Sequence, residues 1–174
     1  MPKLIKYMIT DPRYSLNEIK NSILKHRPDF VCYRNKTYFD KKEILEFLEF
    51  AKKYSNPVIN FDTVKDNPDI IEYFESVHLP SSRLKQIDDF KNKTVFASTH
   101  TIEEVKKAVN ADYITFSPIF NSKGRNGLGI EKLNEICNIH PKVIALGGII
   151  SNNEVEEIKK SKAAGFASIR YFFT

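Results

Sequence analysis

Glycines and positively charged residues follow three apolar segments of the sequence, in a pattern that suits an anion. The residues that we expect to contact this anion are Ser122, Lys123, Gly147, Gly148 and Arg170. Glycine lets backbone N–H groups approach the oxygens of a phosphate, and lysine or arginine supplies positive charge. The sequence therefore predicts a site for a phosphorylated ligand, and we expect the loop 117–129 to close over it.

A second basic pair, Arg34 and Lys36, follows the apolar segment 30–33. The next acidic residue along the chain is Asp40, so neither cation has an adjacent carboxylate to neutralise it. Arginine and lysine in this situation are typical contacts of phosphate oxygens. We predict that both residues bind an anionic ligand.

Two histidines lie at the ends of neighbouring apolar segments. His78 and His100 could move a proton on a bound substrate, although either could also be a hydrogen-bonded structural residue. Thr101 and Glu104 have the spacing of a capping box, which predicts that a helix begins after Thr101. Because Thr101 fills the capping role, Ser98 is left to contact a ligand.

Eight short apolar segments alternate with amphipathic ones along the whole chain. The expected strands are 4–9, 30–33, 58–60, 76–79, 94–97, 113–116, 143–146 and 167–169. Helical patterns cover 15–25, 42–51 and 152–160, and a further one begins at Thr101. Near-continuous apolar strands joined by helices are typical of a parallel sheet that is covered on its faces.

The number of strands predicts a single domain, residues 1–174, with the α/β fold of a (β/α)8 TIM barrel. An open doubly wound sheet is the alternative, but the glycine fingerprint of a dinucleotide fold is missing after the first strand. Active sites of such barrels lie at the carboxyl ends of the strands, where the polar residues of this chain gather. The chain has 174 residues, fewer than the usual minimum of about 200. We therefore expect a compact barrel that lacks a full helix after strand eight.

Charge and hydropathy exclude several classes of partner. The formal net charge is +5, but the lysines stand beside acidic residues on the predicted helices, as on a solvated surface. No arginine stripe or aromatic platform suggests a nucleic-acid interface. No apolar stretch could span a membrane, and the first residues do not resemble a signal peptide. We expect a cytoplasmic protein whose positive field attracts small anionic metabolites.

The remaining cysteines and histidines do not form a metal-binding pattern. Cys32 and Cys137 are the two cysteines of the chain and lie far apart in the sequence. We expect Cys32 to pack in the core. His26 and His140 precede predicted strands, and we expect both at the surface of the opposite rim.

The order of several short motifs resembles the thiamin phosphate synthase/TenI superfamily over nearly the whole chain. These motifs are ITD at 9–11, RNK at 34–36, IN at 59–60, VHL at 77–79, STH at 98–100, ADY at 111–113, SPIF at 117–120, GLG at 127–129 and ALGGI at 145–149. The resemblance implies a (β/α)8 barrel enzyme of thiamine biosynthesis. Its synthases join hydroxymethylpyrimidine diphosphate to a thiazole phosphate and release diphosphate. Its substrates are thus small phosphorylated molecules, and a homodimer is possible.

The resemblance also assigns roles to residues. It implies that Arg34, Lys36 and Lys123 grip the diphosphate and that Asn60, Ser98 and Ser122 contact substrate. His78 and His100 are the candidate proton carriers. The thiazole phosphate is expected on Gly147, Gly148 and Arg170.

The family's Mg²⁺-binding carboxylates are replaced in this sequence. Phe61 and Arg83 occupy their positions, and neither offers the hard oxygen ligand that Mg²⁺ requires. Asp62 is the one neighbouring carboxylate that could substitute, if a bulge turns it inward. We therefore expect no metal ligands and no tightly bound cofactor. Two alternatives to the synthase stay open, namely a TenI-like thiazole phosphate tautomerase and a non-catalytic protein that binds thiazole or thiamine phosphate.

Overall fold

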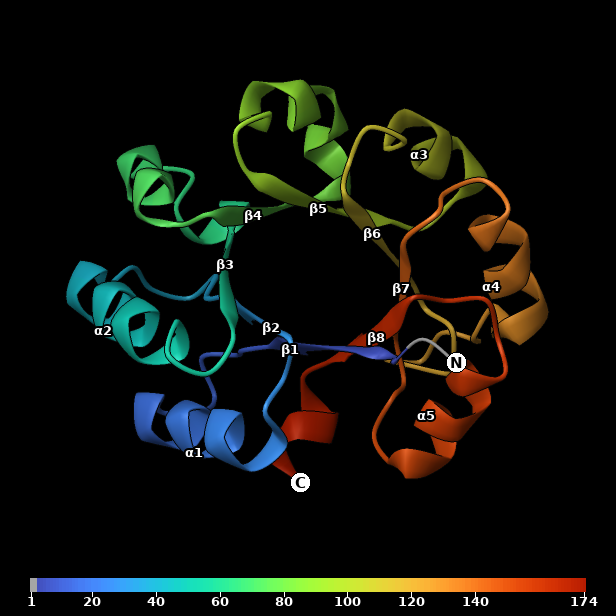
Figure 1. The fold of residues 1–174 in the computed structure, drawn as a ribbon, viewed down its shortest axis with the longest axis horizontal. Coiled ribbons are helices and arrows are strands. Elements are labelled where there is room, and N and C mark those ends of the chain that lie inside the picture. The colour runs from blue at the N-terminus through green and yellow to red at the C-terminus, as the bar shows by residue number, and fades with distance from the viewer. Residues whose placement is uncertain (1–2) are drawn as a thin grey trace.

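The chain folds into a closed barrel of eight parallel strands (Figure 1). The computed structural model describes residues 3–174. Each strand pairs with the next, and β8 pairs with β1 to close the barrel. The strands are β1 Ile5–Ile9, β2 Phe30–Tyr33, β3 Asn56–Asn60, β4 Ser76–Leu79, β5 Thr94–Thr99, β6 Tyr113–Phe116, β7 Val143–Leu146 and β8 Gly165–Ser168. The predicted (β/α)8 barrel is confirmed, and the open-sheet alternative is wrong.

Most strand boundaries agree with the apolar segments, but β5 ends two residues later than predicted, β3 begins two residues earlier, and so does β8. This strand begins at Gly165, two residues earlier than predicted, because Gly165 pairs with Ile5 of β1. A Cβ atom on Gly165 would lie 2.4 Å from the carbonyl oxygen of Ile5. The missing side chain lets the last strand come close enough to the first to close the barrel.

Five α-helices and four 3₁₀ segments surround the strands in residues 3–174 (Figure 1). The helices are α1 Leu16–His26, α2 Lys41–Ala51, α3 Ile102–Lys107, α4 Gly129–Cys137 and α5 Asn152–Lys159. The 3₁₀ segments are η1 Phe61–Thr63, η2 Pro68–Tyr73, η3 Ser81–Phe90 and η4 Arg170–Phe173. The connections after β3, β4 and β8 thus contain no α-helix. Short 3₁₀ turns in these three places make the barrel compact.

The turn η4, which follows β8, packs against α1. Within η4, Phe172 is 1% exposed, and its carbonyl accepts a hydrogen bond from the Ser22 hydroxyl of α1. Phe173 stacks on Tyr14 with the ring centroids 3.8 Å apart. The red C-terminal ribbon lies beside α1 accordingly (Figure 1).

The apolar residues form two layers separated by the strands. A large cluster lies between the strands and the outer helices, and a smaller one fills the barrel interior. Its buried members are Tyr7, Ile9, Cys32, Val58, Phe96, Ile144 and Ala167. They alternate along the strands with residues of the outer cluster, as the period of two in a strand requires. The predicted packing of Cys32 is confirmed.

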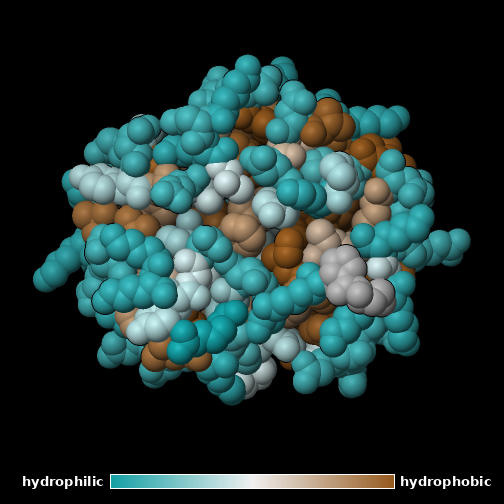
Figure 2. Space-filling view, in the orientation of Figure 1, coloured by the Kyte–Doolittle hydropathy of each residue, from teal (hydrophilic) through white to brown (hydrophobic). Residues whose placement is uncertain are grey.

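The surface is mostly hydrophilic in the view of Figure 2, and its hydrophobic residues show as separate groups between polar ones. None of the helices in residues 3–174 has the length and apolar character needed to cross a bilayer.

Candidate active site

The predicted site residues come from seven strand ends. Those of β2 to β5 are Arg34, Lys36, Asn60, His78, Ser98 and His100, and those of β6 to β8 are Ser122, Lys123, Gly147, Gly148 and Arg170. All strands are parallel, so their carboxyl ends open on one rim of the barrel. The topology therefore places these residues on or above the same rim, although it does not bring every pair into contact.

His78 lies inside the barrel and is held at both ring nitrogens. Its Nδ1 lies 2.7 Å from the Tyr7 hydroxyl, and its Nε2 lies 2.8 Å from Ser98 Oγ. The ring is parallel to that of Phe96, with the centroids 6.0 Å apart. Burial and, secondarily, the positive charge of Arg34 lower the pKa of His78 to about 4. His78 is therefore a neutral imidazole at neutral pH.

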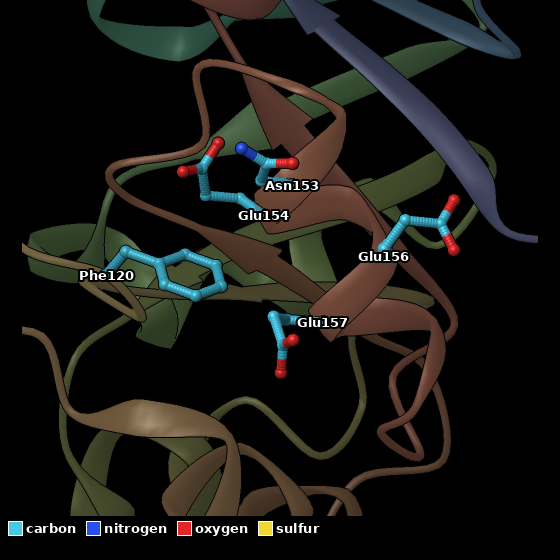
Figure 3. Close-up of a pocket in the computed structure, with 5 residues that line it drawn as sticks. All are labelled: Phe120, Asn153, Glu154, Glu156 and Glu157. Carbon is cyan, nitrogen blue, oxygen red and sulfur yellow. The ribbon is translucent and has the colours of Figure 1, made fainter.

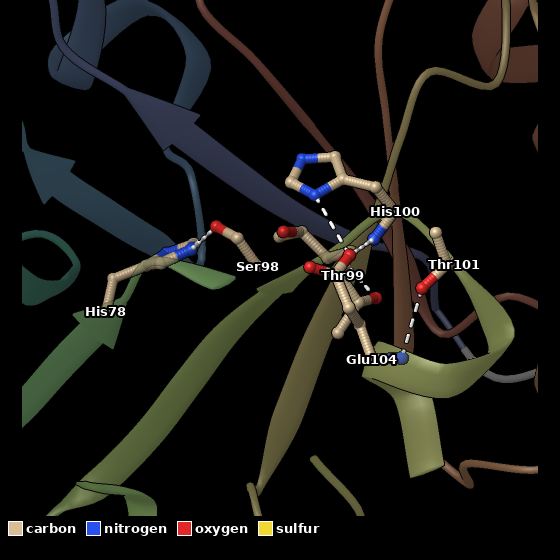
Figure 4. Close-up of polar contacts among 7 residues, drawn as sticks. His78, Ser98, Thr99, His100, Thr101 and Glu104 are labelled. Atoms are coloured by element: carbon tan, nitrogen blue, oxygen red, sulfur yellow. Dashed lines mark hydrogen bonds and ion pairs between the residues drawn. The ribbon is translucent and has the colours of Figure 1, made fainter. Parts of the chain in front are cut away.

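His100 does not join His78. Figure 4 shows the His78 ring pointing at Ser98, whereas the His100 ring lies above Glu104 and is joined to its carboxylate by a dashed line. Glu104 accepts hydrogen bonds from the His100 backbone N–H at 2.8 Å and lies 3.3 Å from its Nδ1. Thr101 caps α3 through the backbone N–H of Glu104, as predicted, but the Glu104 carboxylate turns to His100 instead of completing the box. The two histidines thus occupy separate environments.

The two basic residues after β2 are not equivalent. Lys36 forms an ion pair with Asp62 of η1, with 3.2 Å between Nζ and Oδ2. The separation of the two residues in the sequence could not reveal this partner, because Asp62 lies beyond the next strand, in the turn that follows β3. In residues 3–174, no carboxylate lies within ion-pairing distance of Arg34. The positive charge of Arg34 also lowers the pKa of His78. Because no carboxylate of residues 3–174 pairs with it, Arg34 is better placed than Lys36 to bind an anion.

Phe61 and Arg83 pack against each other. The Arg83 guanidinium carbon lies 5.1 Å from the centre of the Phe61 ring, and Phe61 is buried against Phe90. Asp62 is neutralised by Lys36. Neither a phenyl ring nor a guanidinium offers the oxygen ligand that Mg²⁺ prefers. The residues present therefore do not fit the Mg²⁺ that the resemblance implies.

Asn60 has an unused acceptor at the same rim. Its side chain is 8% exposed, and its Oδ1 has no hydrogen-bond partner among residues 3–174. Asn60 pairs in register with His78 across β3 and β4. A buried acceptor without a partner is costly, so a ligand that donates a hydrogen bond here would relieve it.

The loop 117–129 rests on the glycines that follow β7. The backbone N–H of Phe120 donates to the Gly147 carbonyl, and a Cβ atom on Gly148 would lie 2.6 Å from the Asn121 carbonyl oxygen. At the loop tip, Ser122 and Arg125 exchange two backbone hydrogen bonds. The base of the loop is therefore fixed, and its tip, which carries the exposed Lys123, projects into solvent.

The amides of Gly147 and Gly148 are available to an anion. Neither N–H donates a hydrogen bond to another group of residues 3–174, and both glycines have positive φ angles, 104° and 70°. Arg170 follows the neighbouring strand β8, is exposed, and has no carboxylate partner in the described chain. Two free amides and an unpaired guanidinium at adjacent strand ends suit a phosphate.

A separate hollow of about 360 Å³ lies between Phe120 and α5 (Figure 3). Its other lining residues are Asn153, Glu154, Glu156 and Glu157. Three carboxylates would repel a phosphate, so this hollow does not fit the predicted anion. The candidate site remains the rim at the strand ends.

Two features of the interior escaped the sequence analysis. Tyr7 lies in an apolar segment of the sequence, and its sequence neighbours do not indicate that its hydroxyl contacts His78. His140 was expected at the surface but is 1% exposed, so that expectation is wrong. Its Nε2 lies 3.0 Å from the Ala111 carbonyl, and its Nδ1 accepts from the backbone N–H of Lys142. A histidine that satisfies both ring nitrogens on backbone groups can be buried at little cost.

Comparison with known proteins agrees with this architecture. A family model described as thiamine monophosphate synthase matches residues 6–172. A thiamine-phosphate synthase of Clostridium tetani is 33% identical over 144 residues, which cover 71% of this chain and 66% of that protein. One from Prochlorococcus marinus subsp. pastoris is 31% identical over 162 residues, 82% of this chain and 44% of that protein. The chain thus spans about two thirds or less of the length of these relatives.

A solved structure shares the fold. The thiamine phosphate pyrophosphorylase from Pyrococcus furiosus superposes with a TM-score of 0.78 at 21% identity, over 98% of this chain and 88% of the other. At that identity the likeness concerns the barrel alone.

Proposed function

Because the chain belongs to the thiamine monophosphate synthase family, we propose that it is a transferase of thiamine biosynthesis. It would join hydroxymethylpyrimidine diphosphate to a thiazole phosphate. The bond between the methylene carbon of the pyrimidine and the diphosphate oxygen breaks, and both electrons leave with the diphosphate. The thiazole nitrogen then attacks the cationic carbon, so no proton has to be moved.

Charge stabilisation is the main task of the protein in such a reaction. Arg34, Lys36 and Lys123 would bind the departing diphosphate, and Ser122 lies beside Lys123 in the same loop. The thiazole phosphate would bind the amides of Gly147 and Gly148 with Arg170 alongside. The observation that carries this proposal is the pair of glycine amides after β7 and the arginine after the neighbouring strand β8, none of which has a partner of this kind within residues 3–174.

A second candidate is favoured by the stack of Arg83 on Phe61, which occupies the place of the family's metal ligands. A protein with this stack could bind a thiazole phosphate and tautomerise it, or only hold it. Neither role needs the diphosphate to leave.

The deciding experiment incubates the purified protein with both synthase substrates, with and without Mg²⁺, and measures thiamine phosphate. Formation of thiamine phosphate supports the synthase. Conversion of a thiazole phosphate tautomer without transfer supports the isomerase, and saturable binding without either reaction supports the binder. Gly148→Asp would place negative charge at the anion site, so unchanged affinity for thiazole phosphate in that variant would contradict the assignment of the phosphate site.

A cytoplasmic location and a homodimer belong to the same proposal. Sedimentation equilibrium of the purified protein tests the second, because a dimer would have twice the mass of the 20.2 kDa chain.

A further inference from the structure

Three polar side chains from three strands form a continuous chain inside the barrel. The Tyr7 hydroxyl of β1 reaches His78 Nδ1 of β4, and His78 Nε2 reaches Ser98 Oγ of β5. Tyr7 is fully buried and His78 nearly so, whereas Ser98 is partly exposed near the end of β5. This row of hydrogen bonds therefore connects the Tyr7 hydroxyl, which no ligand can reach, with the Ser98 hydroxyl, which a ligand can reach.

The positions of the protons follow from the available donors and acceptors. Burial, with a further contribution from Cys32, raises the pKa of Tyr7 well above its ordinary value, so this hydroxyl keeps its proton. His78 is neutral and has one N–H and one lone pair. If Nδ1 carried the proton, the buried Tyr7 proton would be left with the Cys32 sulfur, a weak acceptor. Tyr7 therefore donates to Nδ1, and the His78 proton lies on Nε2.

We propose that Tyr7 is a positioning residue that holds His78 in the Nε2–H tautomer and thereby makes Ser98 a hydrogen-bond donor to the diphosphate of the substrate. The Ser98 oxygen accepts the Nε2 proton, so its own hydroxyl proton is free for another acceptor. Arg34 follows β2 on the same rim and has no carboxylate within ion-pairing distance among residues 3–174, whereas Asp62 is paired with Lys36, so a positive charge is available here for an anionic oxygen that meets Ser98. This identification of the ligand rests on the proposed function, whereas the tautomer does not.

The neighbouring Asn60 supports a ligand at this place. The unpaired Oδ1 of Asn60 can accept a hydrogen bond from a ligand, and the Ser98 hydroxyl can donate one to a ligand. Asn60 and Ser98 flank His78 on β3 and β5. A ligand that carries both a hydrogen-bond donor and an anionic oxygen would satisfy both groups.

Nitrogen NMR of the uniformly ¹⁵N-labelled protein tests the tautomer directly, because protonated and unprotonated ring nitrogens have clearly different shifts. The native protein should show a protonated Nε2 and an unprotonated Nδ1 for His78. Tyr7→Phe should turn this single tautomer into a mixture. Tyr113→Phe is the matched control, because Tyr113 also stacks on Phe96 but its hydroxyl has no hydrogen bond within residues 3–174. A native Nδ1–H tautomer, or one that Tyr7→Phe leaves unchanged, would overturn the proposal.

Calorimetric titration with inorganic diphosphate tests the consequence for the ligand. Tyr7→Phe and Ser98→Ala should each weaken binding about tenfold, the effect of one hydrogen bond to a charged group. The double variant should bind no more weakly than Ser98→Ala, because Tyr7 acts only through Ser98. Additive losses would contradict the action of Tyr7 through Ser98, and a native protein that does not bind diphosphate would contradict the role of Ser98. Failure of the synthase assay with these results intact would refute the proposed function alone.

Discussion

At the scale of single residues, the ion pair of Lys36 and Asp62 can open for a ligand. Both side chains are partly exposed, 51% and 25%, and ion pairs of this kind contribute little to stability. We predict that Lys36→Ala weakens diphosphate binding by roughly 1.5–3 kcal/mol, the range for hydrogen bonds to charged groups. Binding of thiazole phosphate should stay nearly unchanged. Titration calorimetry with both ligands measures the difference.

Two further variants separate this effect from a general loss of positive charge. Lys52→Ala removes another ion-paired lysine, the partner of Glu49 on α2, and should not change diphosphate binding. Asp62→Asn should strengthen it, because a negative charge leaves the site and Lys36 is released. If Lys36→Ala weakened both ligands equally, the two subsites would not be separate.

The stacked pair Phe61 and Arg83 leads to a prediction about Mg²⁺. A buried phenyl ring and a guanidinium cannot replace the water that Mg²⁺ loses on binding. We expect no tight Mg²⁺ site in the native protein, and slow or absent synthase turnover. The double variant Phe61→Asp, Arg83→Asp should gain Mg²⁺ dependence, measured as thiamine phosphate formed at increasing Mg²⁺. Its thermal midpoint must be measured in parallel, since the variant loses a buried aromatic side chain.

The opposite result has a defined cause. If the native protein were a robust Mg²⁺-dependent synthase and Asp62→Asn abolished that activity, Asp62 would be the metal ligand. Lys36 would then have to release it when the metal binds.

At the scale of elements, the glycines after β7 hold the loop 117–129 in place. Gly148 and Gly124 both have positive φ angles, 70° and 75°, but a Cβ atom on Gly124 would meet nothing within 4 Å. Gly124→Ala should therefore cost only the backbone term of about 1–2 kcal/mol. Gly148→Ala should cost a further 1–3 kcal/mol or so, because its side chain would collide with Asn121 and Phe120. Urea denaturation of both variants measures the two losses, and equal losses would mean that the loop does not rest on Gly148.

The elements also show how far the sequence could be interpreted. Apolar segments predicted all eight strands, because a parallel barrel buries both faces of each strand. The segments η2 and η3 could not be foreseen, since turns of this length have no strong periodicity. The predicted strand ends showed which residues lie on the rim. They did not predict the pairing of Lys36 with Asp62 or the Tyr7–His78 contact. Those depend on which strands become neighbours and on which side chains face inward.

At the scale of the whole molecule, the barrel interior combines packing with a polar layer. The aromatic rings of Tyr7, Phe30, Phe96 and Tyr113 contact one another below His78, with centroids 4.6 to 6.2 Å apart. Such a stack excludes water and keeps the histidine neutral. The same burial that fixes the ring should therefore make the stability of the protein depend on pH.

The sign of that dependence follows from the histidines. Burial lowers the pKa of His78 to about 4 and also lowers the pKa values of His140 and His26. An unfolded histidine titrates near 6.5, so below that pH the unfolded chain binds protons that the native protein does not. The contribution of the histidines to the free energy of unfolding should stay level above about pH 7 and be lost as the pH drops from about 6.5 to about 4. His78 alone accounts for about 3 kcal/mol of this loss at the lower limit.

Urea denaturation at a series of pH values measures this loss, and His78→Gln and His140→Gln assign it. His78→Gln should lower the stability at neutral pH, because it breaks the contact with Tyr7, but it should also flatten the dependence between about pH 6.5 and about 4. His140→Gln should flatten it separately, because His140 lies on the opposite rim and shares no partner with His78. If the free energy of unfolding of His78→Gln fell with pH as steeply as that of the native protein, protonation of His78 would not cause the loss of stability in acid.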